Sequence, residues 1–382
     1  LPTVTRVLGT VRGPRPGPTL VVIGGLHGNE PAGILALRRV LGGVERLREH
    51  VTGEFVAVSG NRGALARGRR FLHSDLNRVW TDERIRSLRT IAAEEELKDE
   101  AAEQRELLKV LDGVDSRARG RVYVLDLHTT SSVSGPWATI EDTLPSRAFA
   151  LKFPIPIVLG LEEQVDGTLL EHASRSGHVS MVFEGGQHGD PVSVERSEAA
   201  VWVALAAGIV PADRAPGVGK ARERLARDSA GLPRVLEMRY RHAILPTDGF
   251  RMDPGFVNLQ PIREGEVLGR DRRGEVRSPE RGRVLMPLYQ EQGEDGFFVV
   301  REFRPVWLRI SEILRRVGVG RVIHWLPGIR RAAPGSDVLI VDRRIARWFA
   351  LEVLHLLGYR TRRAEGPELI VRRRSHDSSS VR

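Results

Sequence analysis

The chain has 382 residues, of which 41% are hydrophobic and 28% charged, values that are ordinary for a globular protein with a buried core. It contains no cysteine, which excludes disulfides and thiolate ligands, so a transition-metal site would need histidine, aspartate or glutamate. Apolar runs such as residues 201–210 are far shorter than the roughly 20 residues that a membrane span requires. We therefore expect no membrane partner.

The net charge of +10 raises the question of nucleic-acid binding. Arginine accounts for almost all of the 59 basic residues and is spread along the whole chain, which is typical of a compositional bias rather than of a phosphate-binding surface. Nucleic acid is therefore not the expected partner. The first residues lack a basic segment followed by an apolar run, which predicts no secretory signal and a cytoplasmic location.

The first two hundred residues alternate apolar strands with helical stretches, which predicts an α/β fold with a largely parallel sheet flanked by helices. One helix is expected to begin at Pro31, because proline is tolerated in the first helical turn. Longer helices are predicted over residues 82–111 and 194–209. The expected strands are apolar and β-branched, and they cover residues 20–25, 54–59, 122–127, 155–161 and 179–183.

The sequence pattern changes near residue 231. Before it, residues 1–230 are predicted to form one α/β domain, whereas short strands and closely spaced glycine turns predict a small all-β domain over residues 231–305. Residues 306–371 end in a strand–helix–strand pattern and are predicted to form a C-terminal α/β appendage. Residues 372–382 begin with three arginines and continue into a serine-rich end, which predicts a disordered, solvated tail.

A histidine and a glutamate lie three residues apart where the first of these strands runs into a helix. His27 and Glu30 belong to the segment Gly-Gly-Leu-His-Gly-Asn-Glu-Pro, whose glycines permit a tight turn of the backbone. This spacing allows an imidazole and a carboxylate to reach one metal ion. A bare pair of this kind more often has a structural role, such as a glutamate at the positive end of a helix.

Further polar residues follow other predicted strands, and the carboxyl ends of strands are where α/β proteins bind ligands. His128 would complete a set of two imidazoles and one carboxylate, the three protein ligands of a catalytic zinc with a position left for water. Zinc lowers the pKa of such a water to about 7 and polarises a carbonyl. Glu184 ends a buried strand, where a carboxylate is costly unless it is paired or functional, and it is suited to accept the proton of the water.

An aspartate, an asparagine and an arginine share the short segment Asp75-Leu76-Asn77-Arg78. A guanidinium binds a carboxylate through two hydrogen bonds, and the adjacent amide adds a further donor. Asp75 is suited to bind the outer nitrogen of a metal-bound imidazole and so to fix its orientation. In isolation, this tetrapeptide would be interpreted as a surface turn.

Taken together and in this order, these residues closely resemble the succinylglutamate desuccinylase/aspartoacylase family, within the zinc carboxypeptidase superfamily. The resemblance runs from Leu20 to Glu184 and more loosely to Phe298. It implies a zinc-carboxypeptidase-like mixed sheet flanked by helices, a following β domain that covers the active site, and one zinc ion per chain. It further implies His27, Glu30 and His128 as zinc ligands, Glu184 as general base and acid, Asn77 and Arg78 as holders of the substrate carboxylate, and Asp75 behind the ligands.

Three other residues are carried over from the family. Arg70 matches a basic position before the Asp-Leu-Asn-Arg motif and is expected among the substrate-binding residues. Tyr289 lies where members place a tyrosine against the substrate. Arg62 is expected to polarise the carbonyl, but the family's Asn-Pro-Arg-Ala is Asn-Arg-Gly-Ala in this chain, so the arginine is displaced by one residue and another arginine is the alternative.

The resemblance implies a zinc-dependent amidohydrolase acting on a small N-acyl amino acid or a related carboxylate-bearing amide. Water deprotonated by Glu184 would attack the carbonyl, and Glu184 would return the proton to the leaving amine. A carboxypeptidase or amidase that acts on peptides, and so needs an open groove, is one alternative. A basic nucleic-acid-binding or regulatory protein on a hydrolase scaffold is another. The sequence leaves open the acyl group, the amine, a homo-oligomeric state and the choice between zinc and another divalent metal.

Overall fold

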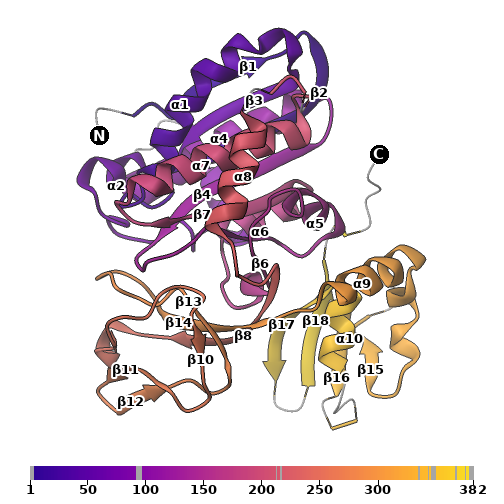
Figure 1. Ribbon diagram of the computed structural model, residues 1–382. Coiled ribbons are helices and arrows are strands. Elements are labelled where there is room, and N and C mark those ends of the chain that lie inside the picture. The colour runs from indigo at the N-terminus through magenta and orange to yellow at the C-terminus, as the bar shows by residue number, and fades with distance from the viewer. Residues whose placement is uncertain are drawn as a thin grey trace.

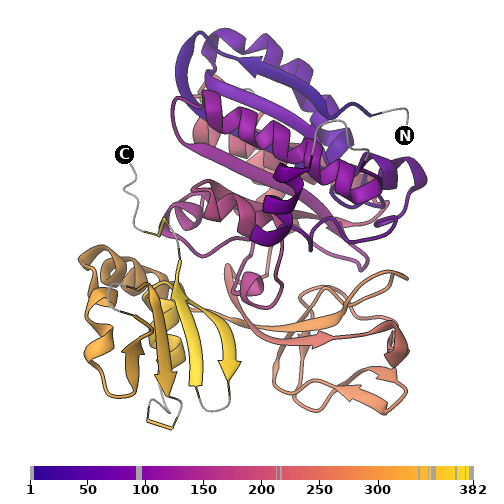
Figure 2. The same ribbon diagram turned by 180° about the vertical axis from the view of Figure 1, so that it is seen from behind.

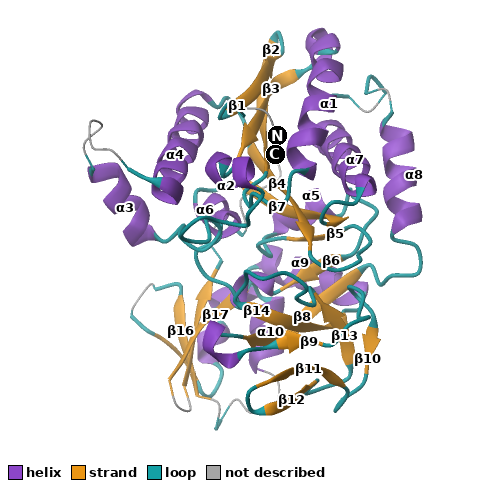
Figure 3. Ribbon diagram, turned by 90° about the vertical axis from the view of Figure 1, so that its left-hand side faces the viewer, coloured by secondary structure: helices purple, strands orange, loops and turns teal. Residues whose placement is uncertain are grey.

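The computed structural model describes residues 4–91, 97–211, 213–215, 217–333, 336–342, 344–345, 350–365, 368–374 and 376–377. Its central feature is an eleven-stranded mixed sheet with the order β1-β3-β2-β4-β7-β5-β6-β8-β14-β13-β10. Helices flank the first half of this sheet on both faces (Figure 3). The mixed α/β architecture predicted from the sequence is therefore confirmed. Among the described helices, none is both long and apolar enough to cross a membrane.

The strands at the centre of the helix-covered half run parallel and are buried on both faces. Such strands read as nearly continuous apolar stretches, which is why the sequence identified them. A fifth strand, β1, pairs antiparallel with β3 at the edge. The strands are β1 (Val7–Arg12), β2 (Arg15–Gly24), β3 (Thr52–Ser59), β4 (Val122–Thr130) and β7 (Val179–Gln187).

Two groups of helices cover the two faces of the sheet (Figures 1 and 2). Along β2, Leu20 and Val22 pack into one hydrophobic core, whereas Val21 and Ile23 pack into the other, as the two-residue period of a strand requires. One face carries α1 (Ala32–Arg46), α7 (Pro191–Gly208) and α8 (Val218–Asp228), and the other carries α3 (Asp82–Thr90), α4 (Asp99–Arg117) and α6 (Leu169–Arg175).

The single helix predicted over residues 82–111 is wrong. The chain leaves the helical conformation at Ile91, which is extended with φ −67° and ψ 128° and packs against the core below α3 and α4. Residues 92–96 lie outside the described part of the chain. The charged, helix-favouring composition of residues 82–111 predicts helix throughout, so nothing in the sequence indicated that Ile91 would leave the helix to contact the core.

The second half of the main sheet continues into the segment that was predicted as a small all-β domain. Strand β8 pairs with β6 on one side and with β14 on the other, so the β-rich segment extends the same sheet. Strands β9, β11 and β12 form a separate three-stranded sheet. The elements are β5 (Trp137–Thr139), α5 (Leu144–Ala150), β6 (Ile157–Leu159), β8 (Val235–Ala243), β9 (Arg251–Met252), β10 (Pro261–Ile262), β11 (Val267–Asp271), β12 (Gly274–Arg277), β13 (Gly282–Leu285) and β14 (Asp295–Glu302).

The C-terminal part forms a four-stranded sheet, β15-β16-β18-β17, with two helices (Figure 1). Leu339, Val341, Leu354 and Val371 contribute to a hydrophobic core of its own. The strand–helix–strand pattern predicted for residues 337–371 is present, together with a strand, β17, that was not predicted. The elements are α9 (Pro305–Val317), β15 (Ile329–Arg331), β16 (Val338–Asp342), α10 (Ala350–Leu356), β17 (Tyr359–Glu365) and β18 (Glu368–Arg373).

The prediction of a solvated tail from residue 372 onward needs correction. β18 extends to Arg373, and the next residue, Arg374, is buried and lies 2.8 Å from Glu162 and 2.7 Å from Glu163. Asp377 is also buried. The partners that compensate these charges are some 200 positions away in the sequence, so the local composition gave no sign of them. Residues 375 and 378–382 lie outside the described part.

Candidate active site

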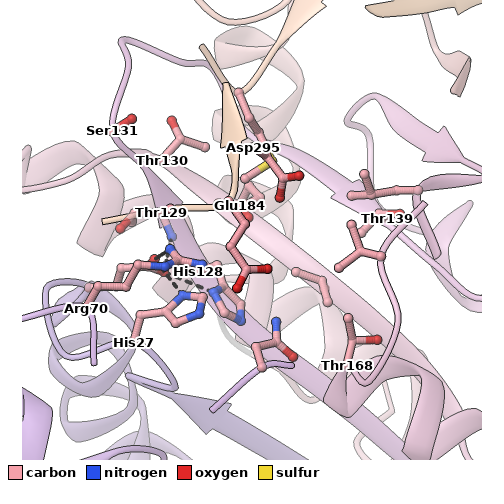
Figure 4. Close-up of a pocket in the computed structure, with 18 of the residues that line it drawn as sticks. His27, Arg70, His128, Thr129, Thr130, Ser131, Thr139, Thr168, Glu184 and Asp295 are labelled. Atoms are coloured by element: carbon pink, nitrogen blue, oxygen red, sulfur yellow. Dashed lines mark hydrogen bonds and ion pairs between the residues drawn. The ribbon is translucent and has the colours of Figure 1, made fainter. Parts of the chain in front are cut away.

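The three residues predicted to bind a metal converge at the carboxyl ends of β2 and β4 (Figure 4). Glu30 lies between the two imidazoles, with Oε1 2.9 Å from His27 Nδ1 and Oε2 3.0 Å from His128 Nδ1. One ligand atom from each residue lies within 4.8 Å of the others, and all three residues are buried. The geometry therefore allows these three side chains to share a single cation.

Glycines make this convergence possible at the end of β2. Gly25 has a φ of 70°, a conformation that L side chains rarely adopt, and it turns the chain sharply. A Cβ on Gly28 would lie 2.1 Å from the backbone of Ala64 in α2 (Arg62–Arg67), so only glycine fits there. Because Gly24 pairs with Leu127 in the parallel register of β2 and β4, the turn that carries His27 lies beside His128.

A second carboxylate binds the outer nitrogen of each imidazole. His27 Nε2 lies 3.1 Å from Asp75 Oδ1, and His128 Nε2 lies 2.8 Å from Asp126 Oδ2. Such carboxylates orient metal-binding histidines and raise their basicity. The role of Asp126 was missed, although its position two residues before His128 on the same strand face was a usable signal.

The charges of the cluster hold one another in their ionised forms. Burial alone would lower the pKa of His128, but Asp126 and Glu30 outweigh it and raise that pKa well above the usual value. Burial likewise opposes ionisation of Glu30, yet His27 and His128 hold its pKa well below the usual range. Two imidazoles and one carboxylate, with outer carboxylates behind them, form the donor set of catalytic zinc sites, so these residues fit a zinc ion.

Glu184 lies on β7 directly beside the cluster, in register with His128. The residue is buried, and its Oε2 has no hydrogen-bond partner among the residues that the structure describes. Burial raises the pKa of Glu184 to about 8, against the lowering effect of His128. A carboxyl group with a raised pKa at the wall of a cavity is suited to take up and release a proton.

Arg62 was expected to polarise the carbonyl and Arg70 to bind the substrate, and of these two the structure brings only Arg70 to the site. Arg70 lines the cavity, with Nη1 3.6 Å from Glu30 Oε1 and Nη2 3.0 Å from Asp75 Oδ2. Arg62 instead points to α4, where its Nη2 lies 2.7 Å from Glu106 Oε2, and it is not among the residues that line the cavity. Arg70 is therefore the arginine positioned to reach a bound substrate.

Asn77 and Arg78 both line the cavity, close to the loop before β14. Asn77 Oδ1 accepts a hydrogen bond from the backbone N–H of Leu169, which fixes the orientation of its amide. Arg78 Nη2 lies 3.3 Å from Asp295, and its Nε lies 3.7 Å from Glu294. Arg78 therefore faces two carboxylates of the protein itself, neither of which the sequence had indicated.

Tyr289 is not brought into the cavity. Its hydroxyl donates to the backbone oxygen of Asp253 at 2.7 Å and accepts from the N–H of Phe256 at 3.0 Å. Its neighbours Leu288 and Gln290 line the cavity in its place. The alternation of side chains along an extended segment accounts for this difference.

The loop before β14 connects the β-rich segment to the turn after β2. Gln290 Oε1 accepts a hydrogen bond from Asn29 at 3.0 Å and lies 3.1 Å from His188 Nε2. His188 in turn lies 2.7 Å from the hydroxyl of Thr129, next to His128. Sequence reasoning missed His188 and Gln290, because a residue in an irregular loop has no periodic pattern that points to its partners.

A single cavity of about 110 Å³ contains the cluster, Glu184 and the two arginines. Its lining comes from the helix-covered half of the sheet and from the β-rich segment alike. The lining residues not yet named are Thr130, Ser131, Thr139, Leu161, Glu162, Val165, Thr168, Leu170, Val182, Met286, Gly293 and Phe298.

The segment that carries most of this site matches a known protein family. Residues 16–201 match the model of the succinylglutamate desuccinylase/aspartoacylase catalytic domain. These residues, just under half of the chain, therefore resemble the catalytic domain of that family. A succinylglutamate desuccinylase of Ectopseudomonas mendocina is 39% identical over 64 residues, which are 17% of this chain and 19% of that enzyme. The chain thus matches less than a fifth of the length of this relative.

Solved structures of the same family share the fold. A succinylglutamate desuccinylase/aspartoacylase of Rhodobacter sphaeroides superposes with a TM-score of 0.56 at 20% identity, over 77% of this chain and 88% of that one. A succinylglutamate desuccinylase of Vibrio parahaemolyticus gives a TM-score of 0.54 at 16% identity, over 77% of this chain and 86% of that one. Likenesses at this identity show the fold and leave the reaction to be argued from the site.

Proposed function

We propose that this protein is a zinc-dependent amidohydrolase that removes the acyl group from an N-acylated amino acid or a related carboxylate-bearing amide. One observation carries the proposal: His27, Glu30 and His128 offer three ligand atoms within 4.8 Å of one another. Beside them lies a carboxyl oxygen of Glu184 that has no hydrogen-bond partner in the described part of the chain. The match of residues 16–201 to a catalytic domain of desuccinylases and aspartoacylases supports it.

The buried cluster would hold the ion. His27, Glu30 and His128 supply the ligands, and Asp75 and Asp126 orient the two imidazoles. A zinc ion bound there would polarise the amide carbonyl and lower the pKa of a coordinated water.

Glu184 moves the proton in this proposal. Its carboxylate accepts a proton from the attacking water as the oxygen bonds to the acyl carbon, and it delivers that proton to the nitrogen as the C–N bond breaks. Arg70 lies on the cluster side of the cavity and donates to the carbonyl oxygen as negative charge builds on it. Asn77 and Arg78 hold the carboxylate of the substrate. The products are a carboxylic acid and a free amine.

The enclosure of the cavity favours a small substrate over a peptide. A peptidase needs an open groove, whereas here the hydrogen bonds of Gln290 to Asn29 and His188 draw the loop across the site. The volume of about 110 Å³ is also small, because pockets for drug-sized ligands measure roughly 300–1,000 Å³.

Metal analysis combined with a hydrolysis screen tests the proposal. We expect about one zinc per chain and release of free amine from N-acetyl and N-succinyl amino acids, with dipeptides at least about tenfold slower in kcat/KM. A chelator should abolish the activity, and added zinc should restore it. Faster cleavage of dipeptides would indicate the peptidase, and a zinc-loaded protein that cleaves none of these amides would overturn the proposal.

A further inference from the structure

The cavity has an apolar compartment beyond Glu184. Val182 precedes Glu184 by two positions on β7 and so shares its face of the sheet, and Thr139 pairs with Val182 across β5. In Figure 4, Thr139 and Thr168 lie on the side of Glu184 that is away from His27 and His128. The apolar residues that line the cavity are Leu161, Val165, Leu170, Val182, Met286, Leu288 and Phe298.

The hydroxyl groups of this compartment are already engaged by the protein. Thr139 donates to the backbone oxygen of Val158 at 3.0 Å, and Thr168 accepts from the N–H of Glu171 at 3.1 Å as the cap of α6. Neither contact provides a positive charge, and the ionisable side chain next to Leu161 in the lining, Glu162, is a carboxyl group. A substrate group placed there would therefore meet chiefly methyl, methylene and aromatic surface.

Apart from the proposed zinc ion, the positive charge available to a substrate is limited. Arg70 and Arg78 are the arginines among the described residues that line the cavity, and no lysine accompanies them. Arg70 is paired with Asp75, and Arg78 faces Asp295 and Glu294. A substrate with two or three carboxylates would bring charges that these arginines cannot all pair, and an unpaired carboxylate in a buried site is costly.

We infer that the preferred substrate carries one carboxylate and an apolar substituent, and that it is not the derivative of a dicarboxylic acid. The inference rests on the proposed function and narrows it. The single carboxylate is held at Asn77 and Arg78, and the apolar substituent, on the acyl or on the amine side of the scissile bond, fills the compartment around Val182. Hydrolysis then consumes one water and gives an apolar amino acid, an apolar acid, or both.

Matched amides test this inference at both ends of the substrate. Butanoyl and succinyl groups have the same chain length and differ in a terminal methyl or carboxylate, and leucine and aspartate side chains are similarly shaped. The zinc-loaded enzyme is assayed with the four combinations of these acyl groups and amino acids. We expect kcat/KM to be at least about tenfold higher for butanoyl-leucine than for any compound with a second carboxylate. Lengthening acetyl to propanoyl and butanoyl should raise it about fourfold per methylene if the acyl group enters the compartment.

A binding measurement keeps this inference separate from the proposed reaction. Calorimetric titration of the protein with leucine, butanoate, aspartate and succinate reports preference even when no amide is cleaved. Tighter binding of the apolar member of each pair supports the inference. Higher kcat/KM or tighter binding for the dicarboxylic member by about tenfold overturns it. If no amide is hydrolysed but the apolar member of each pair binds more tightly, the proposed reaction is wrong and the inferred binding preference still holds.

An arginine introduced into the cavity tests the inference further, and an arginine introduced outside the cavity is its matched control. Leu288 lines the cavity and is partly exposed, so Leu288→Arg is expected to fold and to shift the succinyl-to-butanoyl ratio of kcat/KM by about tenfold toward succinyl. Val257→Arg adds the same charge to the same segment at an exposed position outside the cavity, and it should leave the ratio unchanged. Equal ratios in both variants, with unchanged melting temperatures, would contradict the inference.

Discussion

The protein buries two clusters of charged side chains, and they differ in what completes them. In the candidate active site, two imidazoles and the carboxylates of Glu30 and Glu184 surround a cavity, and one oxygen of Glu184 has no partner among the described residues. Between the helix-covered part and the C-terminal part, a second cluster consists of arginines and carboxylates. The first cluster surrounds the cavity, whereas in the second Arg315 and Arg374 are paired with carboxylates of the protein, of which Glu162 also lines the cavity.

The arginines of the second cluster are each held by carboxylates from distant segments. Arg315 in α9 binds Asp142 and Asp377, both at 2.9 Å. Arg374 after β18 binds Glu162 and Glu163. Burial opposes ionisation of Asp142, but its arginine partners hold its pKa far below the usual range.

The difference lies in the chemistry of the positive groups. Arginine keeps its proton under all ordinary conditions, so the ion pairs of Arg315 with Asp142 and Asp377 can only hold or break. Imidazole and a carboxyl with a raised pKa can exchange a proton or a ligand near neutral pH. We therefore expect substitutions in the first cluster to change turnover and substitutions in the second to change stability.

The largest effect is expected from Glu184→Gln. Removal of the proton-transfer group should lower kcat by about 10³–10⁴-fold, while the zinc content stays near that of the unaltered protein because Glu184 is not a proposed ligand. Glu30→Gln is the matched change within the same cluster, and it should lower zinc affinity at least about tenfold. Activity is followed by amine release and metal by elemental analysis. Full activity in Glu184→Gln would remove this residue from the reaction.

Arg315→Ala should give the next largest effect, on stability. The side chain of Arg315 is fully buried, so its loss leaves Asp142 and Asp377 without their partner, which costs about 3–5 kcal/mol of unfolding free energy. Arg316→Ala is the matched control on the same helix. Its exposed pair with Glu312 should contribute less than about 0.5 kcal/mol. Denaturant titration measures the unfolding free energy of both variants. Equal losses of unfolding free energy would show that the ion pairs of Arg315 do not stabilise the fold more than an exposed pair does.

The pKa of Asp142 predicts how the effect of Arg315→Ala on stability changes with pH. Its folded-state pKa is depressed, so the stability that it contributes is present above the ordinary carboxyl value of about 4 and is lost as the pH falls below it. The difference in unfolding free energy between the unaltered protein and Arg315→Ala should therefore shrink below about pH 4. A constant difference down to pH 2 would contradict this assignment.

The sequence revealed the first cluster better than the second for a physical reason. His27, His128 and Glu184 each follow or end a buried apolar strand, and a polar residue contrasts there with its surroundings. The parallel strand order then brings them together at one edge. Arg315 and Arg374 offer no such contrast in an arginine-rich chain, and their partners lie far away in the sequence. The same limit applies to Asp295 and Gln290, which approach the cavity from the start of β14 and from the loop before it.

Substitution of Arg70, expected to bind the substrate, and of Arg62, expected at the carbonyl, tests which of the two acts in the reaction. Arg70→Lys keeps the charge but loses the planar donor geometry, so kcat should fall by about 10²-fold with little change in KM. Arg62→Ala should leave kcat within about threefold and lower the unfolding free energy by about 1 kcal/mol, because Arg62 pairs with Glu103 and Glu106. A comparable loss of kcat in both variants would place Arg62 at the substrate as well.

The smallest effect concerns a partly buried imidazole that belongs to neither cluster. His172 in α6 stacks on Trp80 with ring centroids 5.2 Å apart, and burial lowers its pKa from 6.5 to about 4. The unfolded chain therefore binds a proton on this histidine before the folded chain does, so stability is lost as the pH falls from about 6.5 to about 4. We expect His172→Gln to remove about 1–2 kcal/mol of this pH dependence, measured as the difference in unfolding free energy between pH 7.5 and pH 5. Glutamine carries no titrating group. If the unfolding free energy of His172→Gln depends on pH as steeply as that of the unaltered protein, other groups cause the loss of stability at low pH. Neither outcome should alter the zinc content, because His172 lies outside the metal cluster.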